Sequence, residues 1–410
     1  ALSSIDPDIA ARSLAQIADV LAAFAGRGGG LRSGPARNTK WSSALSMLSK
    51  ESTRSQGIRE MAKLREIAIS DRSSDSLIRA SRHYEGGAQR LILLSTETCR
   101  KFVRTSSTSS STTSLKPLRE NEWAVATCPA RIDIAGGWSD TPPITFEHGG
   151  IVTNVALKLS GKRPIGARAR VLSDPVLLLV VGDQKVRCEK MDDISDHNTP
   201  HAPAALLKCA LLSIGILDMN KQETLVEQLN SCPGLKGGRG LEIRSWSDLP
   251  QGSGLGTSSI LGACIVACAA RAACIELNRS EIVHAVLLAE QLLSTGGGWQ
   301  DQVGGVYGGA KLSSSDATLP VRVETKTISM PSGFHETLGQ HLVLVYTGRQ
   351  RLARNLLQNV VRRWYARLPE IVSTENDLVL NAQDAAVALK NGDLVEIGKC
   401  LSLYWEQKKT

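Results

Sequence analysis

The stretch Asp248-Leu-Pro-Gln-Gly-Ser-Gly-Leu-Gly-Thr-Ser-Ser259 joins an expected strand, Leu241–Ser247, to a long apolar helix expected over 258–277. Glycines at 252, 254 and 256 let the backbone turn tightly, so that consecutive N–H groups can approach an anion. The helix that follows adds the positive end of its dipole at the same place. This pattern predicts a phosphate-binding loop between a strand and a helix.

Two other phosphate-binding patterns do not fit this loop. No Gly-Lys-Ser/Thr follows it, as in a Walker loop, and its surroundings lack the strand–helix–strand order of a dinucleotide fingerprint. A tight turn without a ligand would explain the glycines equally well. The hydroxyls of Thr257 and Ser258, at the position where a metal–nucleotide would lie, favour phosphate binding over that alternative.

A second Gly-rich segment, Glu290–Gly305 (EQLLSTGGGWQDQVGG), presents one carboxylate, Asp301, on backbone flanked by glycines. A general base or an orienting anion requires such a fixed position. A surface Asp in a Gly-rich turn is the commoner occurrence, but glycine on both sides indicates backbone packed close to a ligand. Glu290, on the preceding helix, is placed to reach a Mg²⁺ ion. Taken alone, it is an ordinary helix carboxylate.

The third segment is Thr127–Pro143 (TCPARIDIAGGWSDTPP). Arg131 and Asp133 lie in an apolar strand, where charged side chains seldom occur without a partner. A purely structural Arg–Asp pair is one explanation of Asp133. Beyond them, Trp138 and Asp140 supply an aromatic ring and a carboxylate, the usual side chains for holding a sugar.

Taken in order, the three segments resemble the motifs of the GHMP kinases, which include galactokinase and the homoserine, mevalonate and phosphomevalonate kinases. Within this family, 136–143 (GGWSDTPP), 163–170 (RPIGARAR) and 345–358 (VYTGRQRLARNLLQ) look like the kinase domain of the fucokinases. Bacterial heptose-phosphate kinases are the next nearest. The likeness covers about residues 120–410.

The resemblance implies a role for each matching residue. Asp301 is the expected catalytic carboxylate near the sugar O1, and Arg131 is expected to stabilise charge or to tune Asp301. Mg²⁺ is expected on Ser258 and Glu290. The expected ATP-binding residues are Pro250, Gly252, Ser253, Gly254, Leu255, Gly256, Thr257 and Ser258, and the expected sugar-binding residues are Asp140, Gly137, Trp138, Gly298, Thr347 and Arg351. The implied reaction is in-line transfer of the γ-phosphoryl group of ATP to O1 of L-fucose.

The residue at position 137 affects which acceptor sugar we expect. In galactokinases the matching segment runs Gly-Glu-His-Thr-Asp, and its Glu is associated with the hydroxyl on sugar C6. A 6-deoxy sugar has a methyl group there, and a buried carboxylate facing a methyl loses its hydrogen bond at a cost of about 1 to 3 kcal/mol. Glycine at position 137 therefore favours L-fucose, unless it only makes room for Trp138.

Two other functions stay open at this point. A heptose-phosphate kinase or another GHMP kinase would need a further basic cluster for its phosphorylated acceptor, and Arg349, Arg351 and Arg354 could supply one. A non-catalytic module would bind sugar and nucleotide as a sensor. The catalytic and metal-binding residues are retained together, which argues against the sensor, because a sensor needs only the binding residues.

Strands and helices are mixed without strict alternation, which indicates an α+β fold rather than a doubly wound sheet. The resemblance implies two α/β lobes with ATP and sugar between them. We expect a mainly helical segment over 1–104, a Ser/Thr-rich linker over 105–119, an ATP-binding domain over 120–320 and an incomplete C-terminal domain over 321–410. The family's third Gly-rich motif, Gly-Ala-Gly-x-Gly-Gly, is absent from the sequence.

Three local expectations can be compared with a structure. Residues 105–114 are all Ser or Thr and are expected to be mobile, because they bury too little apolar surface to offset the entropy of ordering. Trp41–Ser55 is expected as a helix. The β-branched run His341–Tyr346 is expected as a strand.

Composition and charge indicate which kinds of partner and which cellular compartment to expect for this protein. Residues 1–120 hold 19 basic and 11 acidic residues and account for the whole net charge of +8, since the rest of the chain holds 29 of each. The basic excess is scattered without aromatic residues between, which speaks against nucleic acid. No apolar run is long enough to span a membrane. Nine cysteines without metal-ligand spacing indicate a reduced, cytoplasmic protein.

The first residues lack an initiator Met and look cut from a longer chain. Residues 1–104 have no motif of their own, but they resemble the end of the nucleotidyltransferase-like part that precedes the kinase domain in fucokinases. Any homo-oligomer is expected to form through this helical segment.

Overall fold

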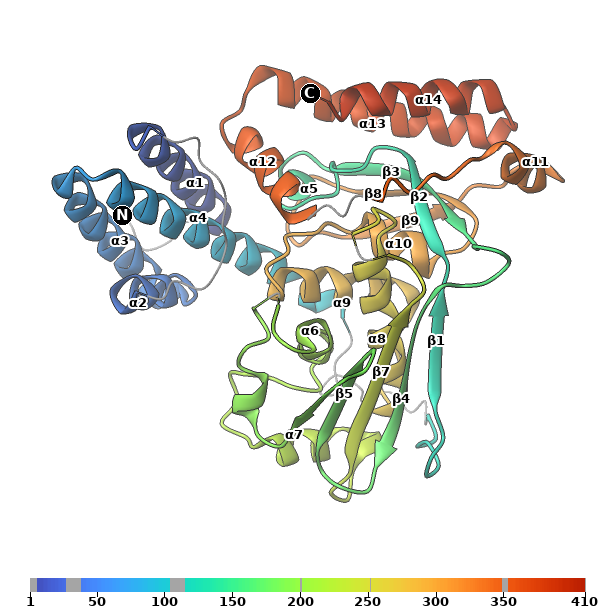
Figure 1. The fold of residues 1–410 in the computed structure, drawn as a ribbon, viewed down its shortest axis with the longest axis horizontal. Helices are drawn as coiled ribbons and strands as arrows, with labels where there is room; N and C mark the ends of the chain where they lie inside the picture. The colour runs from blue at the N-terminus through green and yellow to red at the C-terminus, as the bar shows by residue number, and fades with distance from the viewer. Residues whose placement is uncertain are drawn as a thin grey trace. The chain divides into compact units, whose positions relative to one another are not determined.

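The computed structural model describes residues 6–26, 38–103, 115–199, 201–250, 252–348 and 353–409 (Figure 1). The chain divides into two compact units. One consists of Ala1–Thr98 and Arg354–Val372, and the other of Cys99–Ala353 and Ser373–Thr410. The domain boundaries expected from the sequence stay predictions, and the Ser/Thr run 105–114 lies outside the described residues.

The first unit is helical, as the sequence predicts for this segment. Its helices are α1 (Pro7–Phe24), α2 (Thr39–Leu48), α3 (Glu51–Asp71), α4 (Ser74–Glu97) and most of α12 (Ala353–Tyr365). The single helix expected over Trp41–Ser55 is wrong, because the chain breaks it at Ser49 and Lys50, and Lys50 takes an extended conformation before α3 begins.

Gly87, in the middle of α4, marks where the helices of this unit meet. A Cβ atom on it would lie 3.1 Å from Leu14 Cδ1, 3.2 Å from Met61 Cε and 3.3 Å from Leu48 Cδ1. Glycine inside a helix is less favourable than alanine by up to about 1 kcal/mol. Its presence here is explained by the close approach of side chains from α1, α2 and α3.

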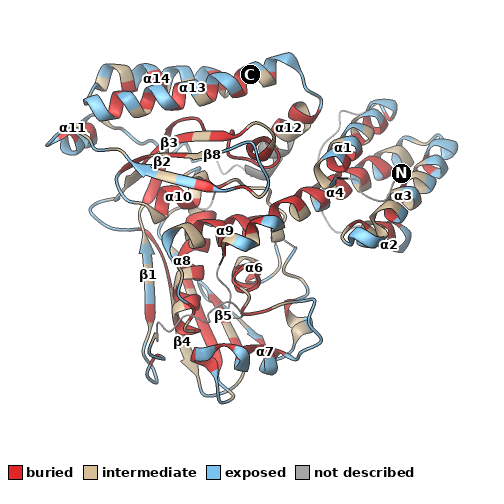
Figure 2. Cartoon of the chain, turned by 180° about the vertical axis from the view of Figure 1, so that it is seen from behind, coloured by how far each residue is buried: buried red, intermediate tan, exposed pale blue. Residues whose placement is uncertain are grey.

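In the second unit, sheet A contains five strands in the order β1 (Ala124–Cys128), β4 (Ile165–Leu172), β7 (Gly240–Ser247), β5 (Leu177–Val181) and β6 (Gln184–Cys188). Neighbouring strands are antiparallel except for β5 and β7. Helix α8 (Thr257–Ala272) packs against β1, β4 and β7, and α6 (Ala205–Ser213) and α9 (Arg279–Leu292) pack against α8. Figure 2 shows the buried residues concentrated along these contacts. Helix α7 (Leu225–Ser231) follows α6 in the sequence.

Sheet B is antiparallel, with the order β2 (Ala130–Ala135), β3 (Gly150–Leu157), β8 (Ala310–Ser315) and β9 (Val323–Thr327). One residue, Pro129, separates β1 of sheet A from β2 of sheet B. Proline has no N–H group to donate to a ladder, so it is found where regular pairing stops. The strand that carries Arg131 therefore starts at the junction of the two sheets.

Helices cover both faces of sheet B. Adjacent residues of β3 point to opposite sides: the Thr153 hydroxyl donates to the Ala382 carbonyl in α13 (Pro369–Asn391) at 2.7 Å, and the Asn154 amide donates to the Gln300 carbonyl in α10 (Gln300–Val306) at 3.2 Å. Helices α11 (Phe334–His341) and α14 (Leu394–Gln407) complete the apolar core with α13. The short α5 (Ile144–Glu147) precedes β3. These strands and helices confirm the α+β class.

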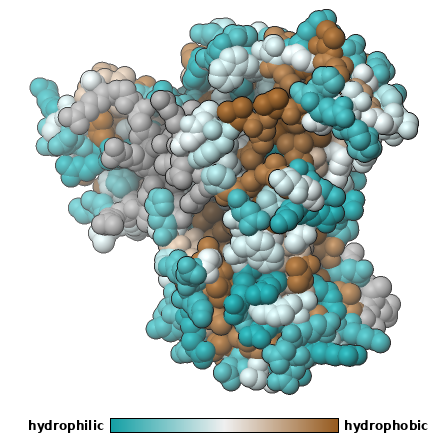
Figure 3. All heavy atoms as spheres, turned by 45° about the vertical axis from the view of Figure 1, so that its right-hand side comes forward, coloured by the Kyte–Doolittle hydropathy of each residue, from teal (hydrophilic) through white to brown (hydrophobic). Residues whose placement is uncertain are grey.

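The strand expected over His341–Tyr346 is wrong. The first residue of this run ends α11, and no strand of the described residues pairs with the remainder. Val343 and Val345 are 81% and 74% exposed, so their β-branched side chains have no sheet to pack on. Figure 3 shows further apolar side chains gathered on one face of the molecule.

Two further findings concern the whole described chain. All nine cysteines are free, and seven of them are buried. None of the described helices is both long and apolar enough to cross a bilayer.

Glu242 is a fully buried carboxylate on β7, beside two arginines. Arg170 Nε, on the paired strand β4, lies 2.7 Å from Glu242 Oε2. Arg244 Nε, on β7 itself, lies 2.5 Å from Glu242 Oε1. Burial alone would raise the pKa of Glu242, but its hydrogen bonds to the two guanidinium groups outweigh burial and lower the pKa below the usual 4.5. The ionised form is therefore the one that stabilises the fold.

We predict that Glu242→Gln lowers the free energy of unfolding by about 1 to 3 kcal/mol at neutral pH, measured by urea denaturation. Because the folded-state pKa is lowered, this contribution is present above pH 4.5 and is lost as the pH falls below it. The difference between variant and wild type should therefore shrink in acid. Glu189→Gln, which removes an exposed pair with Arg187, is the matched control and should change stability little. A difference that grows in acid would contradict the assignment.

Candidate active site

The expected phosphate loop ends at the first turn of α8. Gly256 has φ 72° and is the N-cap residue of this helix, which begins at Thr257. A Cβ atom on Gly256 would lie 3.0 Å from Arg131 Nε and 3.0 Å from Asp301 Cγ. Glycine is thus required here both for its left-handed backbone and for the close approach of two charged side chains.

Arg131 connects the loop to the expected catalytic carboxylate. Its guanidinium donates to Asp301 in the first turn of α10, lies 2.9 Å from Asp133 Oδ2, and donates to the Gly254 carbonyl at 3.4 Å. The side chain is only 7% exposed. Burial disfavours the charge of Arg131, but the two carboxylates outweigh burial and raise its pKa, so the arginine stays charged. The structure therefore brings together three of the segments singled out in the sequence.

Asp133 is a member of this cluster rather than an isolated pair with Arg131. Its Oδ2 faces Arg131, while its Oδ1 is buried and accepts no hydrogen bond from a described residue. Burial raises the pKa of Asp133, and the nearby charge of Asp301 adds to the increase. The local sequence shows the charge in an apolar strand but not the unpaired oxygen.

Asp140 holds the turn after β2 against the start of α10. Its Oδ1 accepts from the Trp138 N–H at 3.1 Å, and its Oδ2 accepts from the Gln300 N–H at 2.9 Å. Trp138 has φ 89°, a left-handed conformation that costs a bulky residue energy and that persists only when the surroundings hold it. Burial raises the pKa of Asp140 to about 6, and the N–H of Gln300 opposes that increase.

Two glycines pack directly against this turn. A Cβ atom on Gly298 would overlap the Asp140 carboxylate, and one on Gly137 would overlap the Tyr404 hydroxyl and the Gln300 side-chain oxygen. No larger side chain fits at either position without displacing a polar group. The absence of a carboxylate at 137 therefore has a steric cause as well as the chemical one considered from the sequence.

Glu290 is buried at the end of α9, next to the phosphate loop. Its Oε1 accepts from the Ser259 hydroxyl at 2.7 Å, and the Thr295 hydroxyl donates to its Oε2. Burial raises the pKa of Glu290, and the charge of Asp301 adds to the increase. Ser258, by contrast, is exposed in the first turn of α8. The hydroxyl that donates to Glu290 is thus that of Ser259. The prediction that Ser258 and Glu290 together bind a metal ion stays a prediction.

Oxygen donors of this kind are the ones that Mg²⁺ prefers. Among the described residues, no group of three or more His, Cys, Asp or Glu side chains is placed to hold a metal ion. Magnesium in phosphoryl-transfer sites is commonly bound by one or two carboxylates together with phosphate oxygens. A site built from Glu290 and a serine hydroxyl at the start of α8 is compatible with that pattern.

Two residues were not found from the sequence because they come from the far end of the chain. Lys408 Nζ lies 3.4 Å from the Trp138 ring centroid and donates to the Gly137 carbonyl at 2.7 Å. Burial and the charge of Asp133 raise the pKa of Tyr404 well above its usual value. No local motif marks either residue, since both read as ordinary positions of a C-terminal helix.

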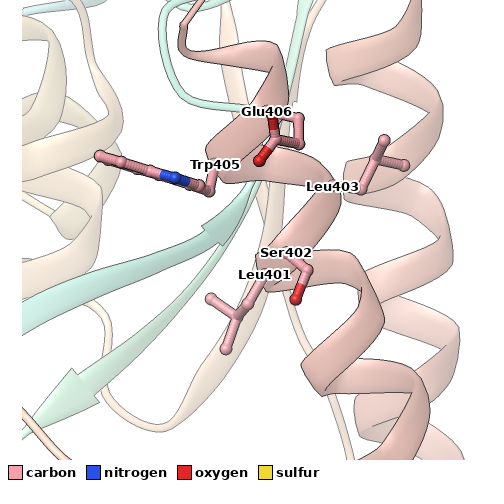
Figure 4. A pocket seen from close by; sticks show the side chains of 5 residues that line it. All are labelled: Leu401, Ser402, Leu403, Trp405 and Glu406. Atoms are coloured by element: carbon pink, nitrogen blue, oxygen red, sulfur yellow. The ribbon is translucent and has the colours of Figure 1, made fainter.

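Two of the expected sugar-binding residues, Thr347 and Arg351, come from the segment after α11. Thr347 is exposed in the irregular segment after α11, and Arg351, like Arg349, lies outside the described residues. Their expected contact with sugar stays a prediction. A hollow of about 530 Å³ lies along α14, lined by Leu401, Ser402, Leu403, Trp405 and Glu406. Figure 4 shows these five side chains on the helix. The hollow contains none of the expected site residues.

Residues 221–309, which include the phosphate loop, Glu290 and Asp301, match the family described as GHMP kinases N terminal domain. This part of the chain is a GHMP kinase N-terminal domain. The resemblance drawn from the three motifs is thereby confirmed.

Two curated proteins are similar to this chain. A bifunctional fucokinase/GDP-fucose pyrophosphorylase of Arabidopsis thaliana is 36% identical over 280 residues, which cover 68% of this chain and 25% of that protein. An L-fucokinase/L-fucose-1-P guanylyltransferase of Bacteroides fragilis is 32% identical over 286 residues, covering 68% of this chain and 30% of that protein. The chain thus spans between a quarter and a third of the length of these relatives.

Among solved structures, a D-glycero-D-manno-heptose 1-phosphate kinase from Bacteroides thetaiotaomicron is 20% identical, with a TM-score of 0.49, covering 70% of this chain and 79% of that one. A galactokinase of Lactococcus lactis, complexed with galactose, is 12% identical, with a TM-score of 0.45, covering 70% and 75%.

We predict that Gly298→Ala lowers the free energy of unfolding by about 1 to 3 kcal/mol, the usual cost of overpacking, because its methyl group would overlap the Asp140 carboxylate. Urea denaturation measures this change. Gly308→Ala is the matched control, since a Cβ atom at Gly308 meets nothing within 4 Å, and it should leave stability unchanged within about 0.5 kcal/mol. Equal effects of the two variants would show that Gly298 is not packed as described.

Proposed function

We propose that this chain transfers the γ-phosphoryl group of ATP to the anomeric O1 of L-fucose, giving L-fucose 1-phosphate. The observation that carries the proposal is the position of Arg131, which bonds at once to the phosphate loop, through Gly254, and to Asp301. A carboxylate is thereby held beside the place where ATP would lie. The names of the two curated relatives, which include fucokinase and L-fucose-1-P, support the choice of acceptor and product.

In this proposal each part of the site has a distinct task. Backbone N–H groups at 252–258 and the N-terminus of α8 bind the phosphates of ATP. Mg²⁺, which Glu290 and Ser258 would hold, supplies positive charge against the phosphate oxygens. Asp301 accepts the proton of the sugar O1 hydroxyl as that oxygen attacks the γ-phosphorus, and the bond from this phosphorus to the β–γ bridging oxygen breaks to release ADP.

Arg131 keeps Asp301 in place. Because the guanidinium also faces Asp133 and is buried, it cannot turn away without leaving two carboxylates unpaired. A base held in one position lowers the barrier chiefly through orientation. Asp140 and Trp138, on the turn after β2, supply the carboxylate and the ring that bind the sugar.

Gly137 supports a 6-deoxy sugar as the acceptor. The space that a side chain at this position would need is filled by Tyr404 and Gln300, so no carboxylate can meet a hydroxyl at sugar C6 from here. A sugar with a methyl group at C6 needs no hydrogen-bond partner at this position. Product use in GDP-fucose salvage, a cytoplasmic location and self-association through residues 1–104 belong to the same proposal.

We predict that Asp301→Asn lowers kcat by at least about two orders of magnitude, because the amide cannot accept the proton. The KM for ATP should change little, since Asp301 does not belong to the phosphate loop. Steady-state kinetics with ATP and L-fucose measure both constants. Asp316→Asn, a change of an exposed Asp just after β8, is the control and should keep normal turnover. Near-normal kcat in Asp301→Asn would remove the role assigned to this residue.

We also predict a substrate preference. In assays with a panel of sugars, kcat/KM should be highest for L-fucose and at least about tenfold lower for D-galactose, the ratio that corresponds to 1.4 kcal/mol of lost interaction. D-glycero-D-manno-heptose 7-phosphate serves as the phosphorylated comparison. A higher kcat/KM for D-galactose or for the heptose phosphate would overturn the choice of L-fucose and leave the kinase assignment intact. Binding of sugar and ATP with no turnover of any sugar would favour the sensor.

A further inference from the structure

Glu375, on α13, is a buried carboxylate with no hydrogen bond. Its exposed fraction is 0%, and neither Oε1 nor Oε2 accepts a hydrogen bond from any described residue. Buried polar groups in proteins are normally paired, since an unpaired one costs about 1 to 3 kcal/mol and a charged one more. Nothing in the fold itself explains why a glutamate occupies this position.

Helix α13 brings Glu375 beside the segment that contains the expected sugar-binding turn: a Cβ atom on Gly136 would lie 2.8 Å from Ala382 Cβ, and Asn376 Oδ1, next to Glu375 in the sequence, lies 2.9 Å from His148 Nε2. The charges of Lys408 and Asp140 act on Glu375 in opposite directions. Lys408 donates to the Gly137 carbonyl and lies over the Trp138 ring, and Asp140 accepts from the Trp138 N–H. Glu375 therefore lies near the turn 136–140 that is expected to bind sugar.

Two more buried acceptors without partners lie around the same turn. They are Asp133 Oδ1 and Gln300 Oε1, and the latter is one of the atoms that a Cβ on Gly137 would meet. The unpaired oxygens of Asp133, Gln300 and Glu375 outnumber the unpaired donor beside Asp133, Arg131 Nε, so a ligand that completes these oxygens must bring donors. Sugar hydroxyls are such donors, whereas a phosphate group would add acceptors and negative charge to a site where the carboxylates Asp133, Asp140 and Glu375 already outnumber the cations Arg131 and Lys408.

We propose that Glu375 is a sugar-binding residue whose carboxylate accepts a hydrogen bond from a ring hydroxyl of an unphosphorylated acceptor sugar. This inference rests on the proposed sugar kinase function and adds to it a residue from α13, more than 230 positions after Asp140 in the sequence. It also gives a reason for preferring a free sugar to a sugar phosphate. Burial raises the pKa of Glu375 to about 7, and Asp140 adds to the increase. A donated hydroxyl would offset part of this burial cost.

The test compares three variants. Glu375→Gln removes the charge, Glu375→Met keeps a similar volume without polar atoms, and Asp377→Asn makes the same loss of charge at an exposed position two residues along α13. We expect the Kd for L-fucose, measured by isothermal titration calorimetry, to rise at least tenfold in both Glu375 variants and less than twofold in Asp377→Asn. The Kd for ATP should stay within twofold in all three.

Thermal unfolding without ligands separates binding from a structural role. A carboxylate kept for the fold would lower the melting temperature when replaced. An unpaired carboxylate kept for a ligand should leave the melting temperature of Glu375→Met unchanged or higher, while the increase produced by L-fucose is reduced. A lower melting temperature together with an unchanged Kd for sugar would overturn the proposal.

Deoxy sugars identify the hydroxyl. Among L-fucose analogues lacking the 2-, 3- or 4-hydroxyl, one should bind at least tenfold more weakly than L-fucose to the wild-type protein but almost equally to Glu375→Met, because the partner is already absent. If every analogue loses the same factor in both proteins, Glu375 contacts none of these hydroxyls and the proposal fails. If the wild type prefers another free sugar, the proposed substrate is wrong, and Glu375 is judged on that sugar with the same variants. If no free sugar binds, both proposals fall.

Discussion

The guanidinium group of Arg131 is the interaction on which the second unit's functional region depends. It is buried at the start of sheet B and contacts a carbonyl of the phosphate loop, Asp301 and Asp133. These partners come from a strand, a loop and a helix and lie up to 170 positions from Arg131 in the chain. A charged group in such surroundings is stable only if its partners stay in place. The same contacts that hold the fold together therefore fix the carboxylate relative to the loop.

Glycine makes this arrangement sterically possible. A Cβ atom on Gly304 would lie 2.6 Å from Arg131 Cβ, and one on Gly256 would lie 3.0 Å from Arg131 Nε. Arg131 is thus enclosed by backbone from two different elements, α10 and the phosphate loop. The Gly-rich composition of both motifs follows from this enclosure as much as from any contact with phosphate.

The sequence predicts the parts of the site that lie within short motifs and misses those that depend on tertiary contact. The phosphate loop, Asp301, Arg131 and Asp140 are recognisable because each stands in a local pattern of glycines or charges. Lys408 and Tyr404 reach the turn 136–140 only through the packing of the C-terminal helix on sheet B, and Glu375 belongs to α13. The sequence surroundings of all three are those of any amphipathic helix. Likewise, Ser258 and Ser259 are equivalent in a motif, and only the direction of each side chain on α8 shows which one meets Glu290. The run His341–Tyr346 has strand composition, yet composition cannot supply a partner strand.

The single residue between β1 and β2 has a mechanical consequence. Pro129 joins sheet A, which packs on α8, to sheet B, which packs on α10, α13 and α14. At this connection, a rotation of one sheet relative to the other requires torsion changes within two residues of Arg131, and proline fixes one of the backbone torsions there. Bending between the layers that carry the phosphate loop and the sugar-side turn is thereby restricted at this strand. The arginine is held not only by its ion pairs but also by a stiff connection in the main chain.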